Sequence, residues 1–367
     1  MRLPLLLLAL GLLACPSAPS DELPTPAPGP AFDAALADAL QLALGRARLQ
    51  VEPPIAAAPG ATAAVLSPDG AVWVGATGFA DIEQDVAMEP GHVLRIGSIT
   101  KTWVAAVTLQ IIDEGGLSQD DTLDGWYPEV PDAGAIRIHD LLAHTSGIPS
   151  YTDEEEFLTG GFLTPASHED ILAWAAAHGP DFAPGDDWAY SNTNYYALGL
   201  ILEDVTGQPL HTLLRERLHQ PLALTGTWME GEEEGSFAPV RGYLSGIDVT
   251  PQVDPSWTWA SGGLVGPALD VSRWMHALVL GDVLPEAARE DQQTPVAPGG
   301  ETAPYGLGLY IVDRGHGRLL GHTGSTMGFQ SDCFVHPESG WVVTVLENDF
   351  NSEASDVADA LWNVLLD

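Results

Sequence analysis

The sequence predicts a mixed α/β (α+β) fold with an antiparallel sheet formed by both chain ends and flanked by helices. Two observations support this prediction. Strand-like segments occur near the amino end and again near the carboxyl end, and helical patterns fill the long region between them. We therefore expect a mainly helical domain, at about residues 117–275, inserted between the two halves of the sheet.

The individual elements follow from local patterns. Alanine and leucine dominate 33–50, which predicts a helix, and residues 62–78 alternate around a Pro-Asp-Gly turn, which predicts a β-hairpin. Residues 98–114 are apolar on several helical faces, so that helix should be largely buried. Residues 117–131 read as a loop. Further helices are expected within 138–149 and at 166–178, 195–206, 210–218 and 352–366, and late strands at 306–313, 319–322, 330–336 and 341–347.

The amino end reads as an export signal. Residues 1–14 carry one arginine and then an apolar run of about a dozen residues, too short to span a bilayer. The ending Leu-Leu-Ala before Cys15 resembles the lipobox of bacterial lipoproteins, which implies lipidation of Cys15. Residues 15–32 are then a proline-rich tether and 33–367 the folded domain. An ordinary signal peptide cut slightly later is the alternative.

Charge and cysteine content narrow the possible partners. The formal net charge of −38 argues against nucleic acid and anionic membrane surfaces. Membrane contact is therefore expected only through the Cys15 anchor, and the protein is expected to be a monomer. Cys333 is the only other cysteine, so the fold is not expected to depend on disulfides. No close metal-ligand spacing occurs among the histidines, and we expect neither a metal nor a cofactor.

Lys101 is the only lysine in the chain; the other twelve cations are arginines. Arginine cannot lose its proton in a protein, whereas a desolvated lysine can. A lysine that acts as a base therefore cannot be replaced by arginine. Lys101 follows Ser98 by three residues, which makes a Ser-x-x-Lys pair. Biased composition and chance are the alternative explanation.

The expected position of this pair at the start of the helix favours a catalytic role for Ser98 and Lys101. Ser98 follows Gly97 and is expected to be the N-cap, with Lys101 one turn on and on the same face. A cation at a helix N-terminus has the unfavourable sign for the helix dipole, and burial disfavours its charge further. Both effects should lower the pKa of Lys101 and make the free amine available, whereas the same positive end favours an oxyanion. Ser98 as an ordinary helix cap is the alternative.

Two further motifs occur in chain order. Tyr190, Ser191 and Asn192 lie in a polar loop that leads into a helix, and His322, Thr323 and Gly324 are expected at a strand end. Ser-x-x-Lys, Tyr-x-Asn and His-Thr-Gly in this order resemble the class C β-lactamase-related serine hydrolases. The resemblance runs from about residue 55 to 365 and includes the segments 144–147, 191–195, 262–263 and 305–308.

This resemblance implies roles for the residues. Ser98 is implied as the acylated nucleophile and Lys101 as its base. Tyr190 would relay a proton to the leaving group, and Asn192 would orient the substrate and the lysine. The backbone N–H groups of Ser98 and Ser325 would form the oxyanion hole. The reaction implied is acyl transfer to the serine followed by attack of water.

His322 departs from the lysine found in many β-lactamases of this group. It is expected, with Thr323 and Gly324, to bind substrate, offering a partial positive charge near neutral pH to a substrate carboxylate. The His-Thr-Gly version resembles D-alanyl-D-alanine carboxypeptidases and D-aminopeptidases more than dedicated β-lactamases.

The leading hypothesis is therefore an exported, lipid-anchored serine hydrolase of the bacterial cell envelope that cleaves a D-amino-acid-containing peptide or related amide. An esterase or a β-lactamase with the same nucleophile is one alternative. A non-catalytic envelope-binding lipoprotein is another, although such a module need not retain a buried lysine. The substrate expected is a small peptide, ester or β-lactam-like molecule.

Overall fold

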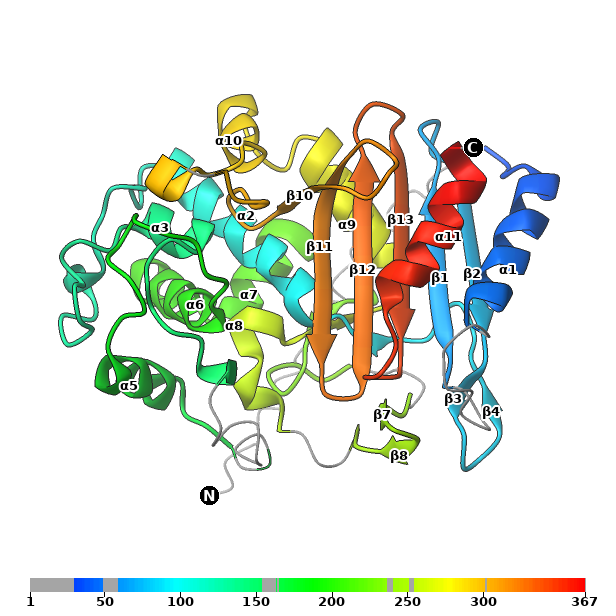
Figure 1. Ribbon diagram of the computed structural model, residues 1–367, viewed down its shortest axis with the longest axis horizontal. Helices are drawn as coiled ribbons and strands as arrows, with labels where there is room; N and C mark the ends of the chain where they lie inside the picture. Colours follow the sequence, from blue (N-terminus) through cyan, green and yellow to red (C-terminus); the bar gives the residue numbers. More distant parts are fainter. Residues whose placement is uncertain are drawn as a thin grey trace, which may run out of the picture.

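The computed structural model describes residues 30–48, 59–153, 163, 165–235, 240–250, 254–300 and 302–366 (Figure 1). Its centre is a six-stranded antiparallel sheet with the strand order β10-β11-β12-β13-β1-β2. The strands are β1 (Ala61–Leu66), β2 (Val72–Thr77), β10 (Tyr310–Asp313), β11 (Arg318–Thr326), β12 (Phe329–His336) and β13 (Trp341–Glu347). Since β1 pairs with β13, the predicted sheet from both chain ends is confirmed.

Both faces of this sheet are covered. The first and last helices, α1 (Ala34–Arg48) and α11 (Ala354–Leu366), lie together on one face, and α9 (Ala268–Leu280) covers the other (Figure 1). In β13, Val343 and Val345 pack toward α1 and α11, whereas Val342 and Leu346 pack into the core on the α9 side. Strands buried on both faces need apolar side chains at nearly every position, which explains their continuous apolar runs.

The region between the two halves of the sheet is mainly helical, as predicted, and lies beyond the β10–β11 side of the sheet (Figure 1). At its centre α2 (Thr100–Asp113) is buried over most of its length, and Trp103 stacks on Trp274 of α9 with ring centroids 4.4 Å apart. Around it lie α3 (Ile138–Ala143), α5 (His168–His178), α6 (Asn192–Thr206), α7 (Leu210–Leu214), α8 (Trp259–Gly262) and α10 (Glu286–Gln292).

Short strands connect this helical region to the start of α2. β9 (Leu264–Gly266) pairs with both β5 (Leu94–Arg95) and β6 (Trp228–Met229). Because β5 directly precedes Ser98 and β9 directly follows α8, this pairing brings the end of α8 next to Ser98. Two other pairs, β3 (Phe79–Asp81) with β4 (Val86–Ala87) and β7 (Tyr243–Leu244) with β8 (Ile247–Asp248), lie outside this region.

Three local predictions need correction. Ser98 is not the N-cap of α2: it lies inside a 3-10 turn, Gly97–Ile99, and the N-cap is Ile99, without a side-chain cap. The His-Thr-Gly motif lies within β11 rather than at its end. The predicted helix 210–218 ends as α7 at Leu214 and continues as a π-helical turn, Arg215–His219. The predicted loop 117–131 is confirmed, with one 3-10 turn at Leu123–Gly125.

The predicted signal peptide, Cys15 and most of the tether lie outside the described residues. Within the described ranges, no helix combines the length and apolarity needed to cross a membrane. The division of the chain at 1–14, 15–32 and 33–367 stays a prediction.

Candidate active site

Two glycines bring the Ser98 turn against strand β11. Gly97 has φ +52°, and a Cβ there would lie 2.8 Å from the backbone nitrogen of Ser325. A Cβ on Gly324 would lie 2.1 Å from the carbonyl oxygen of Ile96 and 3.0 Å from the backbone nitrogen of Ser98. Contacts this close are open only to glycine. The two segments that carry the predicted oxyanion-hole donors are therefore in backbone contact.

The edge of β11 is open at this point. β10 pairs with β11 only over Arg318–Gly321, so it leaves the following residues, through Thr326, without a strand partner on that side. The 3-10 turn with Ser98 packs there instead. Ser325 is exposed, whereas Gly324 before it is buried. Ser98 is itself only half-buried, so both Ser98 and Ser325 can be reached from solvent.

Lys101 is completely buried and makes three polar contacts. Its Nζ lies 3.1 Å from Ser98 Oγ, 2.6 Å from Asn192 Oδ1 and 2.6 Å from the carbonyl oxygen of Ser261. None of these groups is an anion, and no carboxylate in the described part of the chain forms an ion pair with it. Burial without a counter-ion lowers the pKa of Lys101 well below its ordinary value.

A charged amine would donate to all three of these groups, but the lowered pKa of Lys101 favours its neutral form, and the three contacts also accommodate that form. A neutral lysine has two N–H donors and one lone pair, and both the Asn192 amide oxygen and the Ser261 carbonyl can only accept. These two contacts use both N–H groups and leave the lone pair for the hydroxyl of Ser98, which can donate. The geometry therefore fits Lys101 as the acceptor of the Ser98 proton.

Tyr190 contributes a buried hydroxyl to the same place. No hydrogen bond of ordinary geometry links the hydroxyl to another described residue, although the Ser98 hydroxyl lies near enough to interact with it. Burial raises the pKa of Tyr190 well above its ordinary value, and an interaction with the Ser98 hydroxyl opposes this rise only in part. The ring packs 4.3 Å from His144 and lies 4.9 Å from Lys101 Nζ. Tyr190 is thus a protonated phenol beside the serine, suited to pass a proton rather than to act as the resting base.

Asn192 begins α6 and is held from two directions. Its backbone N–H donates to Ser150 Oγ at 3.1 Å, and its Nδ2 donates to Thr152 Oγ1 at 2.8 Å. The backbone N–H of Ser191 donates to Nδ1 of His144, the residue that ends α3 with φ +61°. Two loops far back in the sequence therefore set where α6 begins.

The expectation of a partly charged His322 is wrong for this site. Burial lowers the pKa of His322 to about 3. Its Nδ1 donates to the carbonyl of Thr323, so its Nε2 is the bare nitrogen and accepts from the Tyr305 hydroxyl at 2.9 Å. His322 is neutral at physiological pH and both of its nitrogens are engaged, so it offers no cation to a substrate carboxylate.

The structure thus gathers the predicted residues of this site in one place: Ser98, Lys101, Tyr190, Asn192, His322, Thr323, Gly324 and Ser325. Their catalytic roles stay predictions. Sequence reasoning gave no role to the Ser261 carbonyl, to Ser150 and Thr152, or to Tyr305. Tyr305 and Ser261 lie in or next to motifs quoted above, at 305–308 and 262–263, but Ser150 and Thr152 gave no signal.

The described residues offer no metal centre beside this site. Among the residues that the structure describes, no group of three or more histidine, cysteine, aspartate or glutamate side chains could hold a metal ion. The prediction of no metal and no cofactor stays a prediction.

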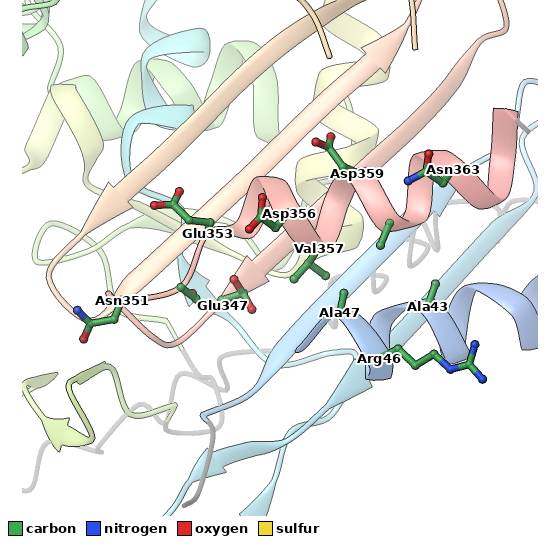
Figure 2. Close-up of a pocket in the computed structure, with 12 residues that line it drawn as sticks. Ala43, Arg46, Ala47, Glu347, Asn351, Glu353, Asp356, Val357, Asp359 and Asn363 are labelled. Carbon is green, nitrogen blue, oxygen red and sulfur yellow. The ribbon is translucent and has the colours of Figure 1, made fainter. Parts of the chain in front are cut away.

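A groove of about 700 Å³ lies elsewhere, between α1 and α11 (Figure 2). Carboxylates line much of it: Glu347, Glu353, Asp356 and Asp359, with Arg46 at one side. It lies on the face of the sheet that α1 and α11 cover, whereas the turn with Ser98 packs against the edge of β11. The groove is therefore not part of the site around Ser98.

Comparisons with known proteins agree with this geometry. The family model described as Beta-lactamase matches residues 48–366. The D-aminopeptidase of Brucella anthropi is 28% identical over 337 residues, which cover 84% of this chain and 59% of that protein. A penicillin-binding protein of Bacillus subtilis is 25% identical over 276 residues, 69% of this chain and 60% of that protein. This chain thus spans about three fifths of the length of these curated relatives.

A solved structure is similar over nearly its whole length. The D-stereospecific amidohydrolase from a Streptomyces species superposes with a TM-score of 0.77 at 30% identity, and the match covers 88% of this chain and 97% of that one.

Proposed function

Since this chain belongs to the Beta-lactamase family and is a serine hydrolase related to the class C enzymes, we propose that it cleaves an amide through an acyl-enzyme on Ser98. The observation that carries the proposal is the environment of Lys101. A buried lysine with two neutral acceptors, no counter-ion and a serine hydroxyl at 3.1 Å is poised to take the serine proton.

In the first step, Ser98 Oγ attacks the amide carbonyl while its proton passes to Lys101 Nζ. The carbonyl oxygen becomes an oxyanion, which the backbone N–H groups of Ser98 and Ser325 stabilise. The C–N bond then breaks, and the leaving amine takes a proton through the Tyr190 hydroxyl. The lysine proton replaces the one that Tyr190 gives up, so the amine departs neutral and the serine is acylated.

In the second step, water attacks the acyl carbonyl. The water proton passes through the Tyr190 hydroxyl to Lys101 Nζ, and Lys101 returns a proton by the same route to Ser98 Oγ as the ester bond breaks. The products are a carboxylic acid and the free enzyme. The high pKa of Tyr190 suits this role, because the phenol is reprotonated after each transfer.

We propose that the substrate is the amide of a D-amino acid or a peptide with an amino-terminal D-residue. D-specific hydrolysis is named for the Brucella and Streptomyces relatives. Neutral His322 also disfavours a carboxylate next to the scissile bond, as a D-alanyl-D-alanine carboxypeptidase substrate or a penicillin has. Carboxypeptidase activity remains the second candidate, because a penicillin-binding protein is among the relatives.

The test uses the full-length protein and its Ser98→Ala variant. We expect a fluorophosphonate to label the protein but not the variant, and D-alanine amide to be hydrolysed faster than L-alanine amide. Labelling that survives in Ser98→Ala contradicts the nucleophile. If the protein is labelled by the fluorophosphonate but hydrolyses only nitrophenyl esters, it is an esterase. Efficient release of terminal D-alanine from D-alanyl-D-alanine peptides indicates a carboxypeptidase. No labelling at all indicates a binding module.

We further propose export and lipid anchoring at Cys15, from the apolar run that precedes it. Labelled palmitate should enter the wild-type protein in a bacterial host but not Cys15→Ser. Labelling of both proteins, or of neither, contradicts the anchor. We also propose a monomer, which light scattering on the purified protein tests directly.

A further inference from the structure

The segment 150–152 is hydrogen-bonded to Asn192, although the segment itself takes part in no step of the proposed reaction. We propose that Thr152 is a positioning residue that keeps the oxygen of the Asn192 amide, rather than its nitrogen, against Lys101. This inference rests on the proposed roles of Ser98 and Lys101. It concerns how the base is kept available for the serine.

The donor and acceptor of each hydrogen bond around Asn192 follow from its backbone N–H, which can only donate. Ser150 Oγ is therefore the acceptor there at 3.1 Å. The hydrogen of Ser150 is then free for Thr152 Oγ1, which lies 2.9 Å away. Thr152 Oγ1 also accepts from Asn192 Nδ2 at 2.8 Å, which leaves Asn192 Oδ1 to face Lys101 Nζ at 2.6 Å.

The orientation of the Asn192 amide determines whether the lone pair of Lys101 is available to the Ser98 hydroxyl. With Oδ1 toward Nζ, Asn192 accepts an N–H of the amine, and the lone pair remains directed to Ser98. With the amide turned over, Nδ2 would donate to that lone pair and compete with the serine hydroxyl. The two orientations have nearly the same shape, so packing alone does not select between them. A polar partner on the far side of the amide does.

Thr152 supplies that partner. Without its hydroxyl, the amide nitrogen loses its acceptor in the present orientation, and an unpaired donor disfavours that orientation. After the flip, the amide nitrogen of Asn192 donates to the lone pair of Lys101, so each of these two groups has a partner. The flipped amide also presents a donor to Lys101, which disfavours the protonated amine and lowers the pKa of Lys101 further.

The test compares Thr152→Val, which removes the hydroxyl, with Thr152→Ser, which keeps it. The readout is the second-order rate of fluorophosphonate labelling from pH 5 to 10, which requires only Ser98 and its base and no knowledge of the natural substrate. We expect the plateau rate of Thr152→Val to fall about tenfold, the effect of one hydrogen bond. We also expect its acid limb to move to lower pH, while Thr152→Ser keeps the wild-type profile.

Thr193→Val is the matched control. Its hydroxyl donates to the carbonyl of Pro149 at 2.7 Å and accepts from the backbone N–H of Tyr151 at 3.1 Å, so it anchors the same loop without touching the Asn192 amide. We expect the acid limb to stay in place in this variant. An unmoved limb in Thr152→Val, or the same displacement in Thr193→Val, overturns the inference.

The two proposals fail in different ways. Labelling that survives in Ser98→Ala removes the proposed nucleophile, and the inference with it. Labelling that depends on Ser98 but keeps an unchanged pH profile in Thr152→Val overturns only the role of Thr152. If Thr152→Val does not fold, as judged by circular dichroism, Thr152→Ala replaces it, with the same expected displacement of the limb.

Discussion

Lys101 is a fully buried cation and Arg314 a largely covered one on opposite sides of one sheet, and they differ in residue type and in their counter-ions. Arg314 lies between β10 and β11 and donates to Asp332 at 2.7 Å, with Asp359 of α11 at 3.5 Å. Lys101 has only neutral partners. The arginine stays charged and braces α11 against the sheet, whereas the lysine becomes a base. Residue type and counter-ion therefore act together: an arginine beside a carboxylate keeps its charge, whereas a buried lysine without a counter-ion can give up its proton.

Asp332, the carboxylate that pairs with Arg314, shows how strongly burial shifts a pKa on that side of the sheet. Asp332 is fully buried, and this burial raises its pKa to about 6 although Arg314 acts in the opposite direction. The pair therefore needs both members. The variants of Lys101, Arg314 and Asn192 described below each move one centre toward the condition of the other.

The largest expected effect comes from giving the catalytic site a cation that cannot deprotonate. In Lys101→Arg, the rate of fluorophosphonate labelling should fall by about 10³-fold or more, because the general base is lost. Arg314→Lys is the reciprocal control and should label at a rate near that of the wild type. A rate within tenfold of wild type in Lys101→Arg would show that the base is another group.

The next effect concerns stability alone. Arg314→Met leaves Asp332 buried without a cation, so the free energy of unfolding in urea at pH 7.5 should fall by about 3 kcal/mol. The labelling rate of the folded protein should not change.

Arg217→Met is the control for Arg314→Met. Arg217 pairs with Glu114 near the surface, and both side chains are partly exposed, at 28% and 56%. Its loss should cost less than about 1 kcal/mol. Equal losses in the two variants would contradict the distinction between buried and exposed pairs.

A smaller effect is expected when Lys101 receives a counter-ion. Asn192→Asp places a carboxylate at the atom that now lies 2.6 Å from Nζ. The anion favours the charged amine, so the pKa of Lys101 rises and the acid limb of labelling moves to higher pH. The rate at pH 7 should fall about tenfold and recover in alkaline buffer. This movement is opposite to that expected for Thr152→Val, and a movement in the same direction would contradict the proposed base.

The smallest effect concerns His322, a titratable group buried without its charge. Its pKa is about 3 in the folded protein and about 6.5 when unfolded, so the unfolded chain binds the extra proton between these values. The stability it contributes is present above pH 6.5 and is lost as pH falls toward 3. Between pH 7.5 and 6 this loss is about 0.8 kcal/mol. The unfolding free energy of His322→Asn should vary less with pH by this amount.

The comparison of His322→Asn with wild type isolates this residue. Asp332 acts in the opposite sense, because its raised pKa makes the folded state bind a proton as pH falls below about 6. That contribution is the same in both proteins and cancels in their difference. Identical pH dependence in the two proteins would mean that His322 already carries its proton in the folded state.

The sequence was sufficient for the parts of the molecule that depend on local pattern. Alternation and turn residues located the hairpin 62–78 and the last two strands, and both were confirmed. The strand predicted at 306–313 begins only at Tyr310, and the one predicted at 319–322 continues to Thr326. The Ser98–Lys101 pair was found because a lone lysine is conspicuous and because three residues of helix bring two side chains together.

The remaining parts depend on contacts that no local pattern encodes. The Ser261 partner of Lys101 is a backbone carbonyl, which any residue type could supply. Thr152 precedes Asn192 by forty residues and is an ordinary loop residue until the fold brings the two together. The charge of His322 was misjudged because its burial and its bond to Tyr305 are tertiary effects. Ser98 was predicted as the N-cap of α2, but it lies in the 3-10 turn that begins at Gly97, a residue with positive φ.

The pairing of β1 with β13 also bears on how the protein is made. Ala61 pairs with Glu347, which follows it by nearly three hundred residues, so β1 and β13 cannot pair until all the residues between them have been synthesised. Contacts between residues so distant in sequence form slowly, because a long loop must close first. Until then the apolar hairpin of β1 and β2 lacks its partner strand and can associate with other chains. Truncations near the carboxyl end should therefore produce aggregated protein rather than a smaller folded core.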